Sequence, residues 1–218
     1  QIEVIGSGEG AVPVWFSSQI VLARISSPFP NQILDAVFAK APRKNFIDER
    51  NLEQLTRLNL KPAPRSSDSE FLRRVYVDTI GKLPTPTETR LFLEEASPEK
   101  RAKVIADLHE RPEFVDYWTY KWADVFLVSG RKLRPEAVKA YYHWLRENVE
   151  KNTPWDQLAS QVVTAKGGSL ENGATNFYAV HQDPETMAEN VSQAFLSLSI
   201  NCAKCHNHPL EKWTNDQY

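Results

Sequence analysis

The first thirty residues alternate apolar and polar positions in the way that β-strands do. Apolar side chains recur at every second position over residues 12–16, and a second β-rich run covers residues 19–25. Two or three strands are not stable alone, so this segment must complete a sheet or pack on the rest of the chain. We therefore expect residues 1–30 to form a short β segment.

From about residue 45 onward, apolar residues recur at the three- and four-residue spacing of amphipathic helices. Capping signals mark several boundaries: Ser67 and Glu70 form a capping-box sequence, and Gly81 is placed to end the same helix. The stretch that leads to Asp183 is expected to be a loop. The predicted helices cover residues 46–58 and 71–80, two segments that begin at Pro86 and Pro98, residues 113–128, a segment from Pro135, residues 154–167 and residues 185–200.

These patterns predict a mainly α protein, a multi-helix domain with a short N-terminal β segment. We divide it into a β-rich segment at 1–30, a linker with a first helix at 31–64, and a helical domain at 65–218. The chain of 218 residues is long enough for one good-sized domain with an appendage. Its hydrophobic content of 41% and charged content of 25% are those of a globular protein that buries a core.

The net charge and the short apolar runs favour neither nucleic acid binding nor a transmembrane segment. A formal net charge of −2 gives no reason to expect nucleic acid binding. The longest apolar runs fall well short of a membrane span, so we expect no transmembrane segment. Residues 1–5 look like the interior of a strand, without the basic and apolar regions of a leader. We expect the native polypeptide to continue past Tyr218.

Both cysteines lie in the pentapeptide 202–206, which reads Cys-Ala-Lys-Cys-His. This pattern is the attachment signature of a c-type haem, and its chance assembly here has a probability on the order of one in several thousand. The thiols of Cys202 and Cys205 would each add across one haem vinyl group, since two intervening residues let both sulfurs reach one edge of the macrocycle. The imidazole of His206 would then bind the iron as the proximal ligand.

Three other chemistries fit the same residues less well. A redox dithiol needs a βαβ context in which the motif opens a helix, whereas helices precede it here. Zinc remains open because Cys202, Cys205, His206 and His208 are four potential ligands. Four ligands within seven residues are cramped for a tetrahedron, since zinc sites usually combine two close and two distant ligands. A structural disulfide is the weakest of the three.

The sequence offers several candidates for the distal iron ligand. His181 ranks first and Met187, the only methionine, second; methionine would raise the reduction potential. A straight helix would place Met187 roughly 22 Å from the first cysteine, and His181 needs a connection that folds back. His208 lies too close to His206 to reach the opposite haem face. A ligand beyond the last residue and an open site follow in the ranking.

Large aromatic rings suit the walls of a flat apolar cofactor. Trp118, Trp122 and Tyr142 are the candidates, although for any single ring an ordinary core position is the commoner explanation. His208 is a further candidate for the haem surroundings, as a partner of a propionate or of the proximal loop. An equally good explanation makes His208 a turn residue. We expect no catalytic residue, because the sequence offers no convincing distal acid–base pair.

Several short segments carry a family resemblance, and the run 201–213, NCAKCHNHPLEKW, is the most specific. The others are residues 43–48, 71–78, 81–85, 112–114, 117–118, 121–124 and 152–156. On these segments, residues 45–218 resemble the planctomycete-type cytochrome c-like domain family, a domain family of unknown function. The resemblance implies a periplasmic or otherwise extracytoplasmic haem protein, with any membrane association through partners. It also implies that residues 1–30 are the tail of a bacterial Ig-like domain.

The sequence therefore predicts an extracytoplasmic c-type cytochrome with one covalent haem c. We expect it to transfer electrons, with a redox protein as partner, as part of a larger redox complex or multidomain protein. One alternative is a structural or assembly subunit of an extracytoplasmic complex. The other is a haem enzyme with an open distal site, which ranks below electron transfer.

Overall fold

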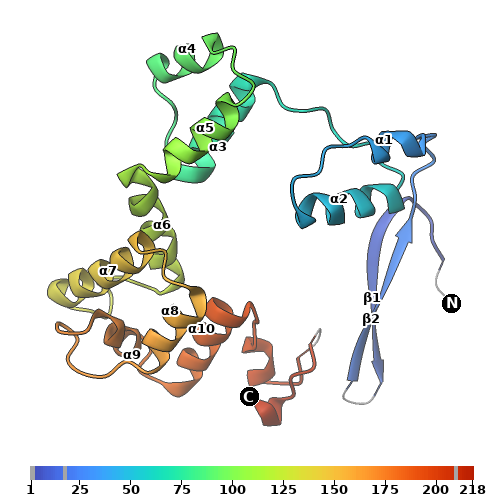
Figure 1. The fold of residues 1–218 in the computed structure, drawn as a ribbon. Helices are drawn as coiled ribbons and strands as arrows, with labels where there is room; N and C mark the ends of the chain where they lie inside the picture. Colours follow the sequence, from blue (N-terminus) through green and yellow to red (C-terminus); the bar gives the residue numbers. More distant parts are fainter. Residues whose placement is uncertain (1–2, 17–18, 209–210) are drawn as a thin grey trace. The chain divides into compact units, whose positions relative to one another are not determined.

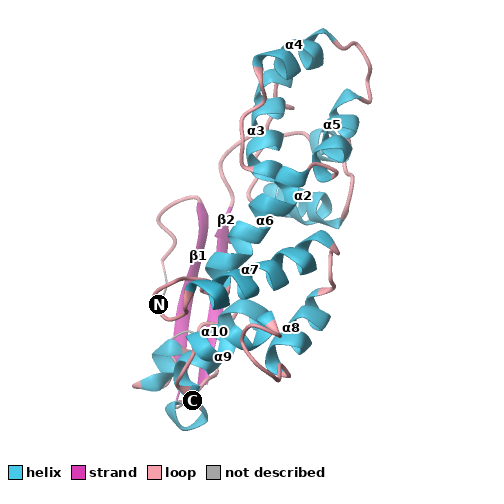
Figure 2. Ribbon diagram, turned by 90° about the vertical axis from the view of Figure 1, so that its left-hand side faces the viewer, coloured by secondary structure: helices cyan, strands magenta, loops and turns pink. Residues whose placement is uncertain are grey.

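The structure is a computed structural model that describes residues 3–16, 19–208 and 211–218. Within these ranges the protein has ten α-helices, and its strands form a two-stranded antiparallel sheet near the N-terminus (Figure 1). Figure 2 shows the same elements coloured by type, with the strands confined to this hairpin. The predicted fold class, mainly helical with a short N-terminal β segment, is confirmed.

The chain divides into two compact units. Residues 1–65 together with 200–218 form the first unit, and residues 66–199 form the second. The first unit holds the β hairpin, two helices and the Cys-x-x-Cys-His motif, and the second holds the other eight helices of the described residues. That residues 1–30 are the tail of an Ig-like domain stays a prediction.

The hairpin of the first unit pairs β1 (Gly8–Phe16) with β2 (Gln19–Ser27) along their full lengths, with Gly8 opposite Ser27. The alternating run and the second β-rich run that predicted strands are therefore both in the sheet. The strand expected over residues 1–5 is not found in the described part of that segment, because β1 begins only at Gly8. Residues 1–2 lie outside the described residues.

Two helices follow the hairpin, α1 (Asp35–Ala39) and α2 (Phe46–Arg57). The Asn45 side chain caps α2 by accepting the backbone N–H groups of residues 47 and 48, which explains why the predicted helix starts there. The backbone N–H of Phe29 donates to the carbonyl of Leu58 at 2.8 Å. This bond ties the chain that leaves β2 to the end of α2.

The second unit begins with three helices, α3 (Asp68–Ile80), α4 (Pro86–Glu94) and α5 (Lys100–His109). The Asp68 carboxylate forms ion pairs with Lys100 and Arg101, each with a nitrogen–oxygen distance of 2.6 Å. These ion pairs join the start of α3 to the start of α5. The helices enclose a small apolar core. Its buried members are Leu72, Tyr76, Ile80, Phe92 and Leu108.

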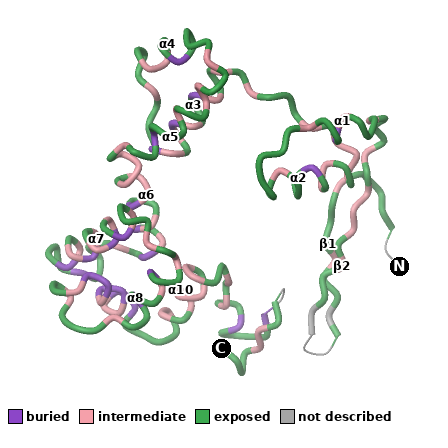
Figure 3. Tube along the Cα trace, in the orientation of Figure 1, coloured by how far each residue is buried: buried purple, intermediate pink, exposed green. Residues whose placement is uncertain are grey.

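A larger core lies among the remaining helices of the second unit. These are α6 (Pro112–Val125), α7 (Pro135–Glu150), α8 (Trp155–Val163), α9 (Asn176–Val180) and α10 (Pro184–Leu196). Figure 3 shows buried residues gathered along α7 and α8. The most deeply buried side chains of this core are Phe126, Tyr141, Leu145, Val162 and Phe177.

Several helices differ from those expected from the sequence, among them α8, which ends at Val163 and not near residue 167. Helix α5 begins at Lys100, because the Ser97 hydroxyl accepts the Glu99 N–H at 3.2 Å and holds Pro98 in the preceding turn. Helix α9 occupies part of the stretch expected to be a loop. Helix α10 ends at Leu196, where the following residue adopts a left-handed conformation with φ of 55°.

Among the described residues, no helix combines the length and the apolar character that crossing a membrane requires. This agrees with the expectation drawn from the short apolar runs of the sequence.

Candidate functional site

The Cys-x-x-Cys-His motif is a tight turn built on the 3-10 helix η2 (Asn201–Lys204). The backbone N–H groups of Cys205 and His206 both lie 3.4 Å from the carbonyl oxygen of Cys202, so the turn closes on the first cysteine. Both cysteines are free thiols and both are exposed. Ala203, between them, is fully buried at 0% exposure and anchors the turn.

The imidazole of His206 is exposed and held by one backbone group. Its Nδ1 atom lies 2.8 Å from the carbonyl oxygen of Asn207. A carbonyl oxygen only accepts hydrogen bonds, so Nδ1 carries a proton, and in the neutral form of the ring the lone pair is then on Nε2. Histidines that bind metals typically show this arrangement, with the other ring nitrogen fixed on a carbonyl or carboxylate.

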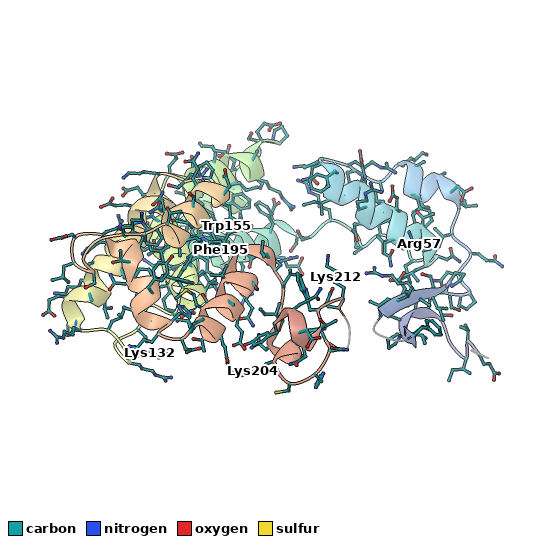
Figure 4. The ribbon with its side chains drawn as sticks, turned by 90° about the horizontal axis from the view of Figure 1, so that it is seen from below. Arg57, Lys132, Trp155, Phe195, Lys204 and Lys212 are labelled. Carbon is teal, nitrogen blue, oxygen red and sulfur yellow. The ribbon has the colours of Figure 1, made fainter. Side chains whose placement is uncertain are left out.

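His208 is buried, with 8% of its surface exposed. Its backbone N–H donates to the carbonyl of Trp213 at 2.8 Å, which folds the residues after the motif back toward it. The Lys212 ammonium lies 5.4 Å from the centroid of the Trp213 ring. Lys204 and Lys212 are labelled in Figure 4. The role of His208 in the haem surroundings stays a prediction.

A zinc site requires several ligand side chains close together. In the part of the chain that the structure describes, no three side chains of His, Cys, Asp or Glu are gathered closely enough to hold a metal ion. The four potential zinc ligands, Cys202, Cys205, His206 and His208, are therefore not arranged as a preformed site.

His181, in the second unit, directly follows α9 and is 3% exposed. Its Nδ1 atom lies 2.9 Å from the carbonyl oxygen of Phe177, and the two rings are 4.3 Å apart. The Nε2 atom is buried and has no hydrogen-bond partner among the described residues. Burial lowers the pKa of this imidazole, so it is neutral near pH 7 with a lone pair on Nε2.

An unpartnered buried acceptor is costly, on the order of 1–3 kcal/mol, and such groups often have a role beyond folding. Lys132 donates to the carbonyl of Val180 at 2.9 Å, and its charge adds to the lowering of the His181 pKa. Met187, the other distal candidate, is half-buried on α10 and packs against the same core as Phe177.

Two of the three predicted wall residues line one cavity of the second unit. Trp118 and Trp122 face a cavity of about 540 Å³. The Trp118 indole N–H donates to the carbonyl of Thr79 at 3.1 Å, and Trp122 contacts Trp155 with ring centroids 4.5 Å apart. Tyr142 is not among the residues that line this cavity.

Trp155 is a member of this aromatic group that sequence reasoning missed. It also contacts Phe195 of α10 with centroids 5.4 Å apart, and both rings are labelled in Figure 4. The polar residues Asn148 and Asn152 line the same cavity. These side chains come from separate segments and meet only through packing, so no local signal marks them as one group.

The fold and the motif together define a mainly helical protein with two exposed thiols and a histidine in one turn. A family model described as PSCyt2, protein of unknown function (DUF1549), matches residues 46–218, and the chain belongs to this family. Searches of curated proteins and of solved structures gave no significant match. The expected membership of a domain family of unknown function is thus confirmed, whereas the cytochrome c character, the cofactor and the reaction stay predictions from the residues themselves.

Proposed function

We propose that this protein is an extracytoplasmic monohaem c-type cytochrome. Cys202 and Cys205 would hold haem c through two thioether bonds, and His206 would bind its iron. The observation that carries the proposal is the geometry of one turn, which presents two exposed free thiols and an exposed imidazole whose Nδ1 atom is held by a backbone carbonyl.

The residues present fit this group in three respects. Thioether formation needs sulfurs that the haem vinyl groups can reach, and both thiols are exposed. Neutral imidazole is the form that ligates iron, and the Asn207 carbonyl selects the correct tautomer of His206. The buried Ala203 fixes the turn between the cysteines. When bound, haem c supplies an iron that changes its charge by one electron.

The distal ligand stays a prediction, with His181 ahead of Met187. His181 is favoured because its Nε2 atom is buried without a partner among the described residues, whereas the half-buried Met187 already packs against the apolar core. The roles of Trp118, Trp122 and Tyr142 as haem walls also stay predictions.

Electron transfer is the reaction that we propose, with a redox protein or another subunit of a redox complex as partner. We place the protein in the periplasm or another extracytoplasmic compartment, because covalent haem attachment depends on machinery outside the cytoplasm.

A structural or assembly role is the second candidate, and one observation favours it. Near the end of the hairpin, Val14, Phe16 and Val21 have 50%, 83% and 65% of their surfaces exposed. Val14 and Val21 are directly paired, so their side chains share one face of the sheet. Apolar side chains gathered in this way mark surfaces that bind other proteins.

A spectroscopic redox titration tests the proposed function. The full chain, produced in a host that attaches haem c outside the cytoplasm, is titrated between its oxidised and reduced forms. Electron transfer predicts a reversible one-electron transition and an unchanged spectrum when carbon monoxide is added to the reduced protein. A carbon monoxide complex that forms readily would indicate an open distal site and favour an enzyme instead. A colourless protein that contains stoichiometric zinc would contradict both.

A further inference from the structure

Asn215 stands in the C-terminal 3-10 helix η3 (Asn215–Gln217) and makes three hydrogen bonds to the motif segment. Its side-chain Nδ2 atom donates to the carbonyl oxygens of Ala203 at 2.9 Å and Lys204 at 2.8 Å. Its backbone N–H donates to the Oδ1 atom of Asn207 at 3.0 Å. One residue therefore binds the motif segment on both sides of the second cysteine.

The two carbonyls that Asn215 binds belong to the residues between the cysteines. They lie at the end of η2, where backbone carbonyls no longer meet the N–H groups of a following helical turn. An amide NH₂ group has two N–H donors and can satisfy both carbonyls. The side chain of Asn215 thereby fixes the backbone that sets the spacing of the two thiols.

The same residue reaches the imidazole through Asn207. The Oδ1 atom of Asn207 accepts the backbone N–H of Asn215, and its carbonyl oxygen accepts the Nδ1–H of His206 at 2.8 Å. With its side chain held, Asn207 presents its carbonyl to the imidazole in one orientation. The hydrogen bonds therefore form a continuous path from Asn215 through Asn207 to His206.

We propose that Asn215 is a positioning residue of the haem-attachment turn. Through Asn207 it holds His206 in the tautomer that leaves the lone pair on Nε2, and through Ala203 and Lys204 it holds the two thiols at a fixed spacing. The inference rests on the proposed function where it makes His206 an iron ligand. The tautomer of His206 is a property of the chain alone and can be tested without haem.

A purely structural explanation would make these bonds a means of folding the C-terminal turn. Gln217 provides the matched control, because it closes the same turn from its other end. Its Oε1 atom accepts the backbone N–H of Thr214 at 3.0 Å. If only the fold of this turn matters, Gln217→Ala should affect His206 as strongly as Asn215→Ala does.

The first test uses the haem-free full chain with its thiols kept reduced. Long-range proton–nitrogen correlations of the five histidine side chains report the tautomer of His206 directly. The wild type should show the Nδ1–H form. Asn215→Ala should give a mixture of tautomers, and Gln217→Ala should leave the signals unchanged.

Asn215→Asp is the second variant. It keeps the size of the side chain but cannot donate to the two carbonyls, and it decides the question if Asn215→Ala does not fold. Unchanged His206 signals in the Asn215 variants, or an equal change in Gln217→Ala, would overturn the proposal.

The second test uses the haem-loaded chain. Mutation of the residues that hold a metal-ligating histidine typically costs 10–100-fold in metal affinity. A tenfold loss that falls on the ferric form raises a one-electron midpoint potential by about 59 mV. Asn215→Ala should therefore raise the potential by at least this amount while it keeps one haem per chain, and an unchanged potential would overturn the inference.

The two tests separate the failure of each proposal. If the wild type takes up no haem, the proposed function fails, and the tautomer measurement still decides the role of Asn215. If haem is attached but neither the tautomer nor the potential responds to Asn215, the positioning role fails and the cytochrome proposal stands.

Discussion

The Nδ1 atom of His181 lies 2.9 Å from the carbonyl oxygen of Phe177, one helical turn earlier in the chain. His206 makes the corresponding bond to the carbonyl of Asn207 at 2.8 Å. In both residues the bond places a proton on Nδ1, so the neutral form of each ring has its lone pair on Nε2, the form in which imidazole binds a metal. His206 is the proximal candidate because it belongs to the Cys-x-x-Cys-His motif, and for His181 the role of distal ligand stays a prediction.

The distal candidates predict different spectra in the haem-loaded chain. If His181 is the ligand, His181→Leu should convert a six-coordinate ferric spectrum to a five-coordinate one, and Met187→Leu should leave it unchanged. The converse result, together with a high potential in the wild type, would assign the position to Met187, because methionine ligation raises the potential. Visible absorption and magnetic circular dichroism of both variants decide between them.

The ion pair between Glu88 and Arg111 predicts a loss of stability in acid. Partial burial disfavours the Glu88 carboxylate, but bonds from the Thr85 backbone N–H and the Arg111 guanidinium outweigh it and lower the pKa to about 2. The ordinary value is 4.5, so the stabilisation is complete above pH 4.5 and is lost as the pH falls toward 2.

Glu88→Gln should therefore lower the free energy of unfolding by about 1 kcal/mol at pH 7, a figure reduced for partial exposure. The difference from the wild type should shrink below pH 4.5, because protonation removes the same charge from the wild type. Urea unfolding at pH 7 and pH 3 measures this. An equal difference at both pH values would contradict the assigned role of the Glu88 charge.

Substitution of Gly81 by alanine should cause a large loss of stability. Its φ of 69° is left-handed, and a Cβ atom at this position would lie 2.3 Å from the Tyr117 ring. Gly81→Ala should destabilise the protein by about 2–3 kcal/mol, because backbone strain and a steric clash add. Gly130→Ala is the matched control, since an added Cβ there meets nothing within 4 Å. Similar unfolding midpoints for the two variants would contradict this account.

Local sequence signals predicted those parts of the fold whose cause is local. The box of Ser67 and Glu70 starts α3, and its two reciprocal bonds are present. Gly81 ends the helix in the left-handed conformation that glycine adopts easily. In each case the residue that carries the signal also makes the bond or takes the conformation that the signal predicts.

The parts that depend on tertiary packing could not be read from the sequence. Helix α9 is only 5 residues long, too short to show a periodic pattern, and it holds the fully buried Asn176 and Phe177. Its end positions His181, so the environment of this distal candidate was equally hidden. Trp155 joins Trp122 only because α8 packs beside α6.

At the candidate site, the sequence predicted the reacting groups but not the residues that hold them in place. Cys202, Cys205 and His206 follow from a motif whose spacing has a chemical reason. The hydrogen bonds of Asn215 join it to residues eight to twelve positions earlier in an irregular turn. No sequence pattern predicts such bonds. Only the structure shows that residues after the motif hold it in place.

The most direct test of the central claim is the mass of the intact chain after purification from an extracytoplasmic compartment, followed by a pyridine haemochrome spectrum of the same sample. The account predicts that the wild type carries the added mass of one haem, which survives denaturation, and shows a c-type haemochrome. The double variant Cys202→Ala/Cys205→Ala should lose the added mass. A wild-type chain of unmodified mass, from a host shown to mature another c-type cytochrome, would contradict the account.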